Sequence, residues 1–497
     1  MKRNTWLLIL ASVAVALWIL IPNLPGEKKK ADGATLSRKY CVSCHEYPDP
    51  SLLQRDIWVN GVLPEMGLRL GIGDKNTLLN RMPLKQFAHL AKLGIYPDTP
   101  LIPIQDWLSI FAYYRDHSPV ERPAQPKKDP VNHGGDLFSQ TLIAADPDDN
   151  GQTTMVRFIP DRGEVWLGSR FATLQTYGLN GVRKLKFHTP SPVVDAIEQK
   201  EPILLSIGNM LPNEDRNGRL YSMNDTGGHP ILLADSLHRP VQVVRADLNK
   251  DGREDLVIAE FGFETGQVRM IDGRSGVTSI LSQQPGPRNI ILRDEDKDGL
   301  PDLYILFAQA REQVSFFHNE GGGKFKEKVL LRFPPVYGSS YMDMADMNGD
   351  GLVDLILANG DNADYSLSLK AYHGVRIYLN NGKGGYEEKW FYPAYGATKA
   401  IAGDFDGDGD QDMAMIAFFS EAGMGGSFIY FENLGGMRFK PWDMKVPDGL
   451  WLVMESGDMD KDGDLDLILG NFQFGPDSIA RPTRHIQALI LKNQAKR

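Results

Sequence analysis

Five stretches of the sequence share one acidic pattern, and each continues into a short apolar run. The stretches are DLNKDGREDL (247–256), DEDKDGLPDL (294–303), DMNGDGLVDL (346–355), DFDGDGDQDM (404–413) and DMDKDGDLDL (458–467). The apolar runs, such as LILAN (355–359), are strand-like, and a later strand-like run often ends in an Asn/Gly turn, as in VRIYLNNGKGGY (375–386). Strand and turn units that recur about every fifty residues predict the blades of a β-propeller.

Two weaker copies of the same unit precede these five. DPDDNGQTT (146–154) has Thr154 at the last acidic position, and VVDAIEQKEPILLSIGN (193–209) keeps the strand-like runs without the acidic spacing. Residues 131–497 also have the length of seven repeats of about fifty residues. We therefore predict an all-β, seven-bladed β-propeller over residues 131–497.

The acidic pattern, D-x-[DN]-x-D-G-x-x-D, has the character of a calcium loop. Alternation places the side-chain oxygens of positions 1, 3 and 5 around one point, Gly at position 6 permits a sharp turn, and Asp at position 9 closes the cage. One copy alone could be a solvated turn, but five copies in phase with the strands predict five Ca²⁺ sites. The absence of His and Cys from the pattern disfavours zinc and copper. The predicted ligands are Asp247, Asn249, Asp251, Asp255, Asp294, Asp296, Asp298, Asp302, Asp346, Asn348, Asp350, Asp354, Asp404, Asp406, Asp408, Asp412, Asp458, Asp460, Asp462 and Asp466.

On these loops and strands, the region 131–497 resembles the FG-GAP/VCBS repeat family, which includes the calcium-bearing propeller of integrin α chains. The resemblance implies that the first, third, fifth and ninth residues of each loop are ligands. It also implies a seven-bladed propeller in which the ions act as structural staples. The two upstream copies depart from the family's pattern.

The only two cysteines lie in CVSCH (41–45). In a C-x-x-C-H motif, the thiols of Cys41 and Cys44 can attach one haem covalently, and the adjacent imidazole of His45 can bind its iron. A zinc site would require further Cys or His ligands, and a thioredoxin-like motif would require a βαβ setting. We therefore predict one haem c.

The second axial iron ligand is less well defined by the sequence. We expect Met66, because it lies in VLPEMGLRLG (62–71), a stretch expected to form a loop stiffened by Pro and Gly that could present its sulfur to iron. Met82, His89 and His117 are the alternatives. An open sixth position would instead favour small-ligand binding or peroxide chemistry.

Residues 35–119 resemble the cytochrome c family. The haem motif lies near the start of this segment, and DWLSIFAYYRDHSP (106–119) is similar to the family's closing helix. Trp107, Ile110, Phe111 and Tyr114 fall at helical spacing and form one apolar face there. The resemblance implies a small all-α domain that carries electrons.

The N-terminal residues indicate export. Lys2 and Arg3 precede an apolar run from Trp6 to Ile21, so residues 1–22 are predicted to be an uncleaved membrane anchor or, alternatively, a cleaved signal. A charged linker follows at 23–34, and the Pro-rich stretch 120–130 is a second linker between the haem domain and the propeller. The protein is thus expected to be a multidomain protein of the periplasm or cell envelope.

The functional expectation is electron transfer to a redox partner protein or a membrane electron-transport chain, with the propeller as a docking module that can also bind a protein or carbohydrate. The net charge of −10 argues against nucleic-acid binding. Two alternatives remain, namely a haem-coupled propeller dehydrogenase that oxidises a sugar or alcohol, and a binding or adhesion module in which the haem is secondary. An electron-transfer protein is favoured over an enzyme, since the propeller sequence contains neither a nucleophile triad nor a nucleotide-binding loop.

Overall fold

The computed structural model describes residues 31–146, 150–223, 230–361, 364, 368–419, 426–473 and 482–495. The expected signal or anchor at 1–22, and the linker as far as residue 30, lie outside these residues. Within the described residues, no helix has both the length and the apolar character needed to cross a membrane.

The chain begins with a small helical part. Its helices are α2 (Gly33–Tyr40), α3 (Arg55–Ile57), α4 (Leu63–Arg69), α5 (Asn76–Leu79), α6 (Leu84–Lys92) and α7 (Ile104–His117), with 3₁₀ turns at Cys41–Ser43 and Pro50–Leu52 and a π-helical turn at Trp58–Val62. Asp32 caps α2 by accepting a hydrogen bond from the Thr35 backbone N–H at 2.8 Å. The first helix packs against the last so closely that a Cβ on Gly33 would lie 2.2 Å from the Ser109 carbonyl oxygen.

The predicted apolar face of α7 packs inside this helical part. Trp107, Ile110 and Tyr114 are buried, and Phe111 is half-buried at its edge. They form a cluster with Trp58 and with residues of α2 and α4. Burial of one helical stripe is what makes short helices stable in water.

The rest of the described chain forms seven four-stranded antiparallel sheets, which confirms the predicted seven-bladed β-propeller. Blade 1 contains β2 (Thr153–Ile159), β3 (Glu164–Ser169), β4 (Thr173–Gly178) and β5 (Arg183–His188); blade 2 contains β6 (Val193–Ile197), β7 (Ile203–Ser206), β8 (Gly218–Ser222) and β9 (Ile231–Leu237). Blade 3 contains β10 (Pro240–Ala246), β11 (Asp255–Glu260), β12 (Gln267–Ile271) and β13 (Thr278–Ser282); blade 4 contains β14 (Pro287–Arg293), β15 (Asp302–Phe307), β16 (Gln313–Asn319) and β17 (Phe325–Arg332). Blade 5 contains β18 (Ser339–Ala345), β19 (Asp354–Asn359), β20 (Gly374–Asn380) and β21 (Tyr386–Pro393); blade 6 contains β22 (Ala397–Gly403), β23 (Asp412–Ala417), β24 (Phe428–Asn433) and β25 (Phe439–Trp442). Blade 7 contains β26 (Trp451–Gly457), β27 (Asp466–Asn471), β28 (Ile486–Asn493) and β1 (Phe138–Ala144).

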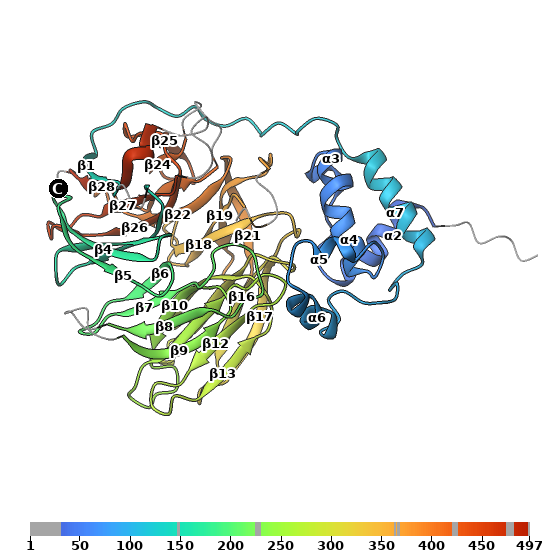
Figure 1. The fold of residues 1–497 in the computed structure, drawn as a ribbon. Helices are drawn as coiled ribbons and strands as arrows, with labels where there is room; N and C mark the ends of the chain where they lie inside the picture. The colour runs from blue at the N-terminus through green and yellow to red at the C-terminus, as the bar shows by residue number, and fades with distance from the viewer. Residues whose placement is uncertain are drawn as a thin grey trace, which may run out of the picture.

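The last blade is assembled from both ends of the propeller. Strand β1 pairs antiparallel with β28, with Phe138 opposite Asn493 and Ala144 opposite Ile486. The first strand of the propeller thus becomes the outermost strand of blade 7, as Figure 1 shows at the meeting of the cyan and red ribbons. This pairing closes the ring with backbone hydrogen bonds and covers the edge of β28.

Polar side chains join neighbouring blades at their first strands. The first strands of the seven blades contact one another in a closed series. At five of the seven junctions, a side-chain oxygen of one first strand accepts a hydrogen bond from a backbone N–H of the next. These bonds join Asp195 to Val243 (2.9 Å), Gln242 to Ile290 (2.5 Å), Asn289 to Met342 (3.3 Å), Asp343 to Ala402 (2.9 Å) and Glu455 to Phe158 (2.7 Å).

The strand order assigns the loops to two faces of the propeller. Because neighbouring strands run antiparallel, loops between first and second strands leave one face, and loops between second and third strands leave the opposite face. The acidic loops are of the first kind. The helical part contacts loops of the second kind, since Tyr96 donates a hydrogen bond to Glu264 (2.8 Å) and Gln86 donates one to Asp215 (2.7 Å). The helices therefore lie against the face opposite the acidic loops (Figure 1).

Candidate functional sites

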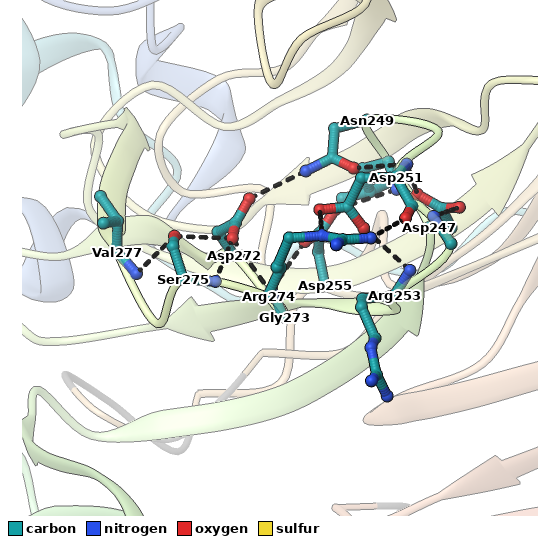
Figure 2. Close-up of polar contacts among 12 residues, drawn as sticks. Asp247, Asn249, Asp251, Arg253, Asp255, Asp272, Gly273, Arg274, Ser275 and Val277 are labelled. Carbon is teal, nitrogen blue, oxygen red and sulfur yellow. Dashed lines mark hydrogen bonds and ion pairs between the residues drawn. The ribbon is translucent and has the colours of Figure 1, made fainter.

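Each acidic loop connects the first and second strands of its blade, from blade 3 to blade 7. In the loop of blade 3, shown in Figure 2, the two carboxylate oxygens of Asp247 accept hydrogen bonds from the backbone N–H groups of Asp251 (3.1 Å) and Gly252 (2.9 Å). Asn249 also accepts a bond from the Asp251 N–H at 3.0 Å. The carboxylate of Asp247 therefore fixes the conformation of the turn by accepting hydrogen bonds from its backbone.

Two loop positions adopt left-handed backbone angles. Gly at position 6 was expected to do so, and Gly252 has φ +81°. The sequence pattern did not single out position 4, where Lys250 has φ 58° and where two of the other four loops also carry Lys. A non-glycine residue in this region is uncommon, and the surrounding carboxylate hydrogen bonds hold it there.

The ninth-position Asp performs a second task that the loop pattern did not reveal. Asp255 is buried as the first residue of β11; its Oδ2 accepts a hydrogen bond from the Leu248 N–H (3.0 Å) and its Oδ1 accepts one from the Gly273 N–H (2.8 Å), beyond the end of β12. The same pair of backbone contacts recurs at Asp302, Asp354, Asp412 and Asp466. Each ninth Asp thus ties its loop to the third strand of its own blade.

Replacing Asp466 with Asn tests this backbone role. Asp466 accepts bonds from Met459 N–H (2.8 Å) and Asn493 N–H (2.7 Å), and an amide offers only one acceptor oxygen for these two donors. We expect Asp466→Asn to lower the free energy of unfolding by about 1–3 kcal/mol even in EDTA, measured by urea unfolding. Asp458→Asn, in the solvent-accessible part of the same loop, is the control and should lower the free energy of unfolding in EDTA by less than Asp466→Asn does. Equal stability of Asp466→Asn and wild type would contradict the backbone role of Asp466.

The acidic loops bring ligand oxygens together. Oxygens of Asp294, Asp296 and Asp298 lie within 4.8 Å of one another, as do those of Asp404, Asp406 and Asp412 and those of Asp458, Asp460 and Asp466. The loops of blades 3 and 5 have Asn at the third position. In blade 3, Arg274 also donates to the Asp251 carboxylate at 2.9 Å, so one predicted ligand there already has a cationic partner (Figure 2).

The loops of blades 6 and 7 have a further feature that fits a cation, although Asp460 of blade 7 also pairs with Lys492. Asp410 and Asp464 add a further carboxylate at position 7 of these loops. One carboxylate oxygen of each, and one of Asp460, is buried without a hydrogen-bond partner in the part of the chain that the structure describes. Burial and neighbouring carboxylates raise the pKa of both Asp410 and Asp464 to about 6. Unpartnered buried carboxylate oxygens in an all-oxygen site are what Ca²⁺ would satisfy.

The C-x-x-C-H motif follows directly after α2. Cys41 begins a 3₁₀ turn, the Cys44 N–H donates to the Cys41 carbonyl oxygen at 3.4 Å, and both thiols are free. Burial raises the pKa of the Cys41 thiol to about 11, although the neighbouring Tyr114 lowers it, whereas Cys44 is exposed. Both sulfurs therefore lie on one turn and remain available for thioether bonds.

The imidazole of His45 is oriented by the backbone. Its Nδ1 lies 2.8 Å from the Glu46 carbonyl oxygen, which can only accept a hydrogen bond, so Nδ1 carries the proton and Nε2 is left as the donor atom for a metal. Burial lowers the pKa of His45, which favours the neutral ligand form. These features fit an axial ligand of haem c.

The candidates for the second axial ligand of a haem iron lie in different surroundings. Met66 packs in the same cluster as Tyr40 and Tyr114, which flank Cys41, whereas Met82 packs in a second cluster. His89 and His117 are exposed, and His117 Nδ1 donates to the Tyr113 carbonyl oxygen at 2.9 Å.

The expected loop around Met66 is wrong, because this residue lies in helix α4. Helix α3, the π-helical turn at Trp58–Val62 and α4 form one continuous helical run, and Pro64 lies within it directly after the π-helical turn. A π-helical turn is a local irregularity at which a helix can continue past a residue that lacks an N–H donor.

A pocket of about 240 Å³ lies between the helical part and the propeller, and the sequence had not indicated it. Its lining residues are Val42, Ser43, Cys44, His45 and Glu46 from the helical part and Arg311, Glu312, Gln313, Arg332 and Phe333 from blade 4. The C-x-x-C-H motif therefore faces the propeller rather than bulk solvent alone.

Buried polar residues around Glu312 and Lys370 form a cluster beside this pocket, at the connection between β17 and β18. Glu312 accepts hydrogen bonds from the backbone N–H groups of Gly338 (3.1 Å) and Ser339 (2.8 Å), and burial raises its pKa to about 7. Lys370 donates to the Val336 carbonyl oxygen at 3.1 Å and to Asp361. These bonds hold the connection between β17 and β18 in one conformation.

His373 in this cluster is a source of acid sensitivity. It is 1% exposed, neither ring nitrogen has a hydrogen-bond partner among the described residues, and burial beside Lys370 lowers its pKa to about 3 despite the nearby carboxylate of Asp361. Since the unfolded chain takes up this proton near pH 6.5 and the folded chain does not, stability is lost as pH falls below 6.5.

We expect the difference in unfolding free energy between wild type and His373→Leu to change by up to about 1.4 kcal/mol per pH unit from pH 6.5 to 4.5, with wild type losing more. The measurement is urea unfolding of both proteins in EDTA, so that calcium binding does not contribute. Parallel pH profiles for the two proteins would rule out this role.

The propeller sequence is similar to FG-GAP-like repeats and to parts of integrin α chains. An FG-GAP-like repeat model matches residues 294–357 and 358–415. Integrin alpha-3 of Cricetulus griseus is 30% identical over 182 residues, which is 32% of this chain and 16% of that protein; integrin alpha-4 of Xenopus laevis is 31% identical over 120 residues, or 22% and 10%. The Neurospora crassa Pan2 WD40 domain aligns with a TM-score of 0.46 and 11% identity over 74% of this chain and 100% of that domain.

The fold is a seven-bladed β-propeller, and the acidic loops of blades 4 to 6 lie in the region that matches FG-GAP-like repeats. The chain spans about one sixth or less of the length of these integrin relatives. The repeat match lies wholly within the propeller, so the haem assignment rests on the motif at residues 41–45 and its surroundings.

Proposed function

We propose that this chain is an exported monohaem c-type cytochrome that transfers electrons, and that its propeller binds five Ca²⁺ ions and serves as a docking module. The observation that carries the electron-transfer proposal is the arrangement of residues 41–45. Two free thiols share one turn, and the adjacent His45 uses Nδ1 on a backbone carbonyl and keeps Nε2 for a metal.

The residues have distinct tasks in this proposal. Cys41 and Cys44 would hold the haem covalently, His45 would bind its iron, and Met66 is the proposed second ligand. The bound haem supplies the one-electron chemistry. The apolar cluster around Trp107 and Tyr114 excludes water from this side of the motif, which is how a protein adjusts a reduction potential.

The proposed location is the periplasm or cell envelope, with a redox partner protein or a membrane electron-transport chain as the electron acceptor or donor. Two points support this location. The apolar N-terminal run predicts export, and covalent haem attachment requires export. The five calcium loops face away from the haem motif, so they would brace the propeller without taking part in electron transfer.

A second candidate is a binding module for a protein or carbohydrate, in which the haem is secondary. A polar pocket of about 480 Å³ in blade 2 favours it; the pocket is lined by Arg216, Arg219, Asp235 and backbone and amide groups around Asn209 and Asn217. If this function is the main one, replacement of both cysteines should leave ligand binding intact.

The decisive experiment is expression with a c-type haem maturation system, followed by mass spectrometry and a reduced-minus-oxidised spectrum. We expect wild type to exceed its polypeptide mass by one haem and Cys41→Ala/Cys44→Ala to carry none. Val42→Ala, at an exposed position between the two cysteines, is the matched control and should keep the haem. A wild-type protein with the mass of its amino acids alone would refute the electron-transfer proposal.

A further inference from the structure

We propose that the pocket of about 480 Å³ in blade 2 is a binding site for a carboxylated sugar, such as a hexuronate. Arg216 and Arg219 bind the carboxylate of this ligand, and Asp235 accepts hydrogen bonds from its hydroxyl groups. The inference rests on the second candidate function, a binding module, and deepens it by naming the class of ligand and the residues that select it. It does not depend on the haem.

The pocket lies at the junction of blades 1 and 2. The connection between β7 and β8 supplies Arg216 and Asn217, the connection between β5 and β6 supplies Ser191, and the end of β9 supplies Asp235. By the strand order, these segments lie on the face that carries the helical part, opposite the acidic loops. A volume of about 480 Å³ falls within the roughly 300–1,000 Å³ in which proteins enclose small ligands.

Two arginines supply the positive charge of this pocket. Among the residues that the structure describes, the exposed guanidinium of Arg216 has no hydrogen bond or ion pair. Arg219 uses its Nε to donate to Asp235 at 3.2 Å, and its other donors have no partner among the same residues. Because a guanidinium binds a carboxylate through two parallel N–H donors, this pair of arginines favours an anionic ligand.

Asp235 distinguishes the pocket from a site for a simple anion. Its Oδ1 accepts hydrogen bonds from the Ser236 N–H at 2.7 Å and from Arg219, and these bonds lower its pKa, so this carboxyl group is ionised. Its Oδ2 is left to accept hydrogen bonds from a ligand. A sulfate ion has no donor to offer this oxygen and would be repelled by it, whereas sugar hydroxyl groups can donate to it. A ligand with both a carboxylate and hydroxyl groups therefore fits the charges of the pocket.

The lining also argues against a neutral or apolar ligand. Of the described residues that line the pocket, Pro190 alone has an apolar side chain, and none is aromatic. Burial of apolar ligand surface would therefore contribute little to the affinity. Hydrogen bonds to ionised groups are roughly twice as strong as those between neutral groups, so the two arginines are expected to provide most of the binding free energy.

Hydrogen bonds hold the walls of the pocket in place. The Ser191 Oγ accepts a hydrogen bond from the Gly208 N–H at 2.9 Å. In the connection between β7 and β8, Glu214 accepts hydrogen bonds from the Glu264 N–H and the Thr265 hydroxyl, both at 2.7 Å, which tie this connection to blade 3. A site that is fixed in this way loses little conformational entropy when a ligand binds.

The test is isothermal titration calorimetry of the full chain in excess Ca²⁺ with D-glucuronate, D-glucose and acetate. Glucose has the hydroxyl groups without the carboxylate, and acetate has the carboxylate without the hydroxyl groups. We expect glucuronate to bind, and glucose and acetate each to bind more weakly by about tenfold or more, because each lacks one of the two groups that the pocket recognises.

Variants of the pocket test the assigned residues. Arg216→Gln/Arg219→Gln should weaken glucuronate binding by about tenfold or more. Asp235→Ala should remove the advantage of glucuronate over acetate, because the acceptor for the hydroxyl groups is lost. Arg293→Gln, which removes an exposed arginine at the acidic-loop face of blade 4, is the matched control and should bind glucuronate like the wild type.

Selective binding of glucuronate that is lost in the double arginine variant and kept in the control supports the inference. Three results would each overturn it: no binding of glucuronate to the wild type at millimolar concentrations, glucose or acetate binding as tightly as glucuronate, or equal binding by the wild type and the double arginine variant. All three leave the electron-transfer proposal standing, and leave the binding-module candidate open to another class of ligand. The haem spectrum of the same samples tests electron transfer separately, and a wild type without haem would leave this inference intact.

Discussion

Removing Ca²⁺ with EGTA is expected to lower the unfolding temperature of the purified protein by about 10 °C or more. An ion that binds only the folded state stabilises it by about 2.7 kcal/mol when present at a hundred times its dissociation constant. An unfolding entropy of about 2.1 cal/mol/K per residue makes 1 kcal/mol worth roughly 1.3 °C in a propeller of this size, so the loss of all five proposed sites would account for the change. Differential scanning calorimetry in EGTA and in excess Ca²⁺ provides the measurement.

The calcium prediction has a control within the chain. Asp404→Asn/Asp406→Asn should reduce the number of bound ions by one in native mass spectrometry. Asp443→Asn, which changes a carboxylate that accepts hydrogen bonds from His133 and Gly134 outside the loops, should leave the number unchanged. Mg²⁺ should not restore the lost stability, because it requires a smaller octahedral site. Identical unfolding temperatures in EGTA and in Ca²⁺ would show that calcium does not stabilise the folded propeller.

Arg157→Ala is expected to lower the free energy of unfolding by about 2–4 kcal/mol. Arg157 projects from β2 and pairs with Glu455 of blade 7 at 2.8 Å and with Asp195 of blade 2, so one guanidinium joins three blades where the ring closes. The Asp195 side chain is 8% exposed and that of Glu455 is 21% exposed. Removal of the arginine would leave two partly buried carboxylates without the guanidinium that pairs with both, and with only the more distant charge of Lys399.

Because the Arg157 side chain is 32% exposed, the expected effect is smaller than that of a fully enclosed ion pair. Arg219→Ala is the matched control, because the Arg219–Asp235 pair at 3.2 Å is 47% exposed at both side chains and should contribute no more than about 1 kcal/mol. Guanidinium unfolding of both variants in excess Ca²⁺ checks the prediction. If Arg157→Ala lowers the free energy of unfolding no more than Arg219→Ala does, the Arg157 ion pairs do not stabilise the contacts between the blades.

Several long-range features could not be read from the chain. The spacing of the repeats predicted seven blades, but not that β1 would complete blade 7 by pairing with β28, because the two strands lie at opposite ends of the propeller. The loop pattern predicted the acidic positions, but not the backbone N–H of Asn493 that the carboxylate of Asp466 accepts. Around Met66, Pro and Gly suggested a loop, and packing of α4 against the apolar cluster made a helix instead.

The sequence by itself determined the repeat, the acidic loops and the C-x-x-C-H motif. Each of these depends on residues a few positions apart, and strand, turn and ligand geometry are set at that range. Only the tertiary structure decided that the C-x-x-C-H motif lies against blade 4, on the face opposite the acidic loops, with Arg311 at its side. That arrangement depends on contacts between residues more than two hundred positions apart, which local patterns do not encode.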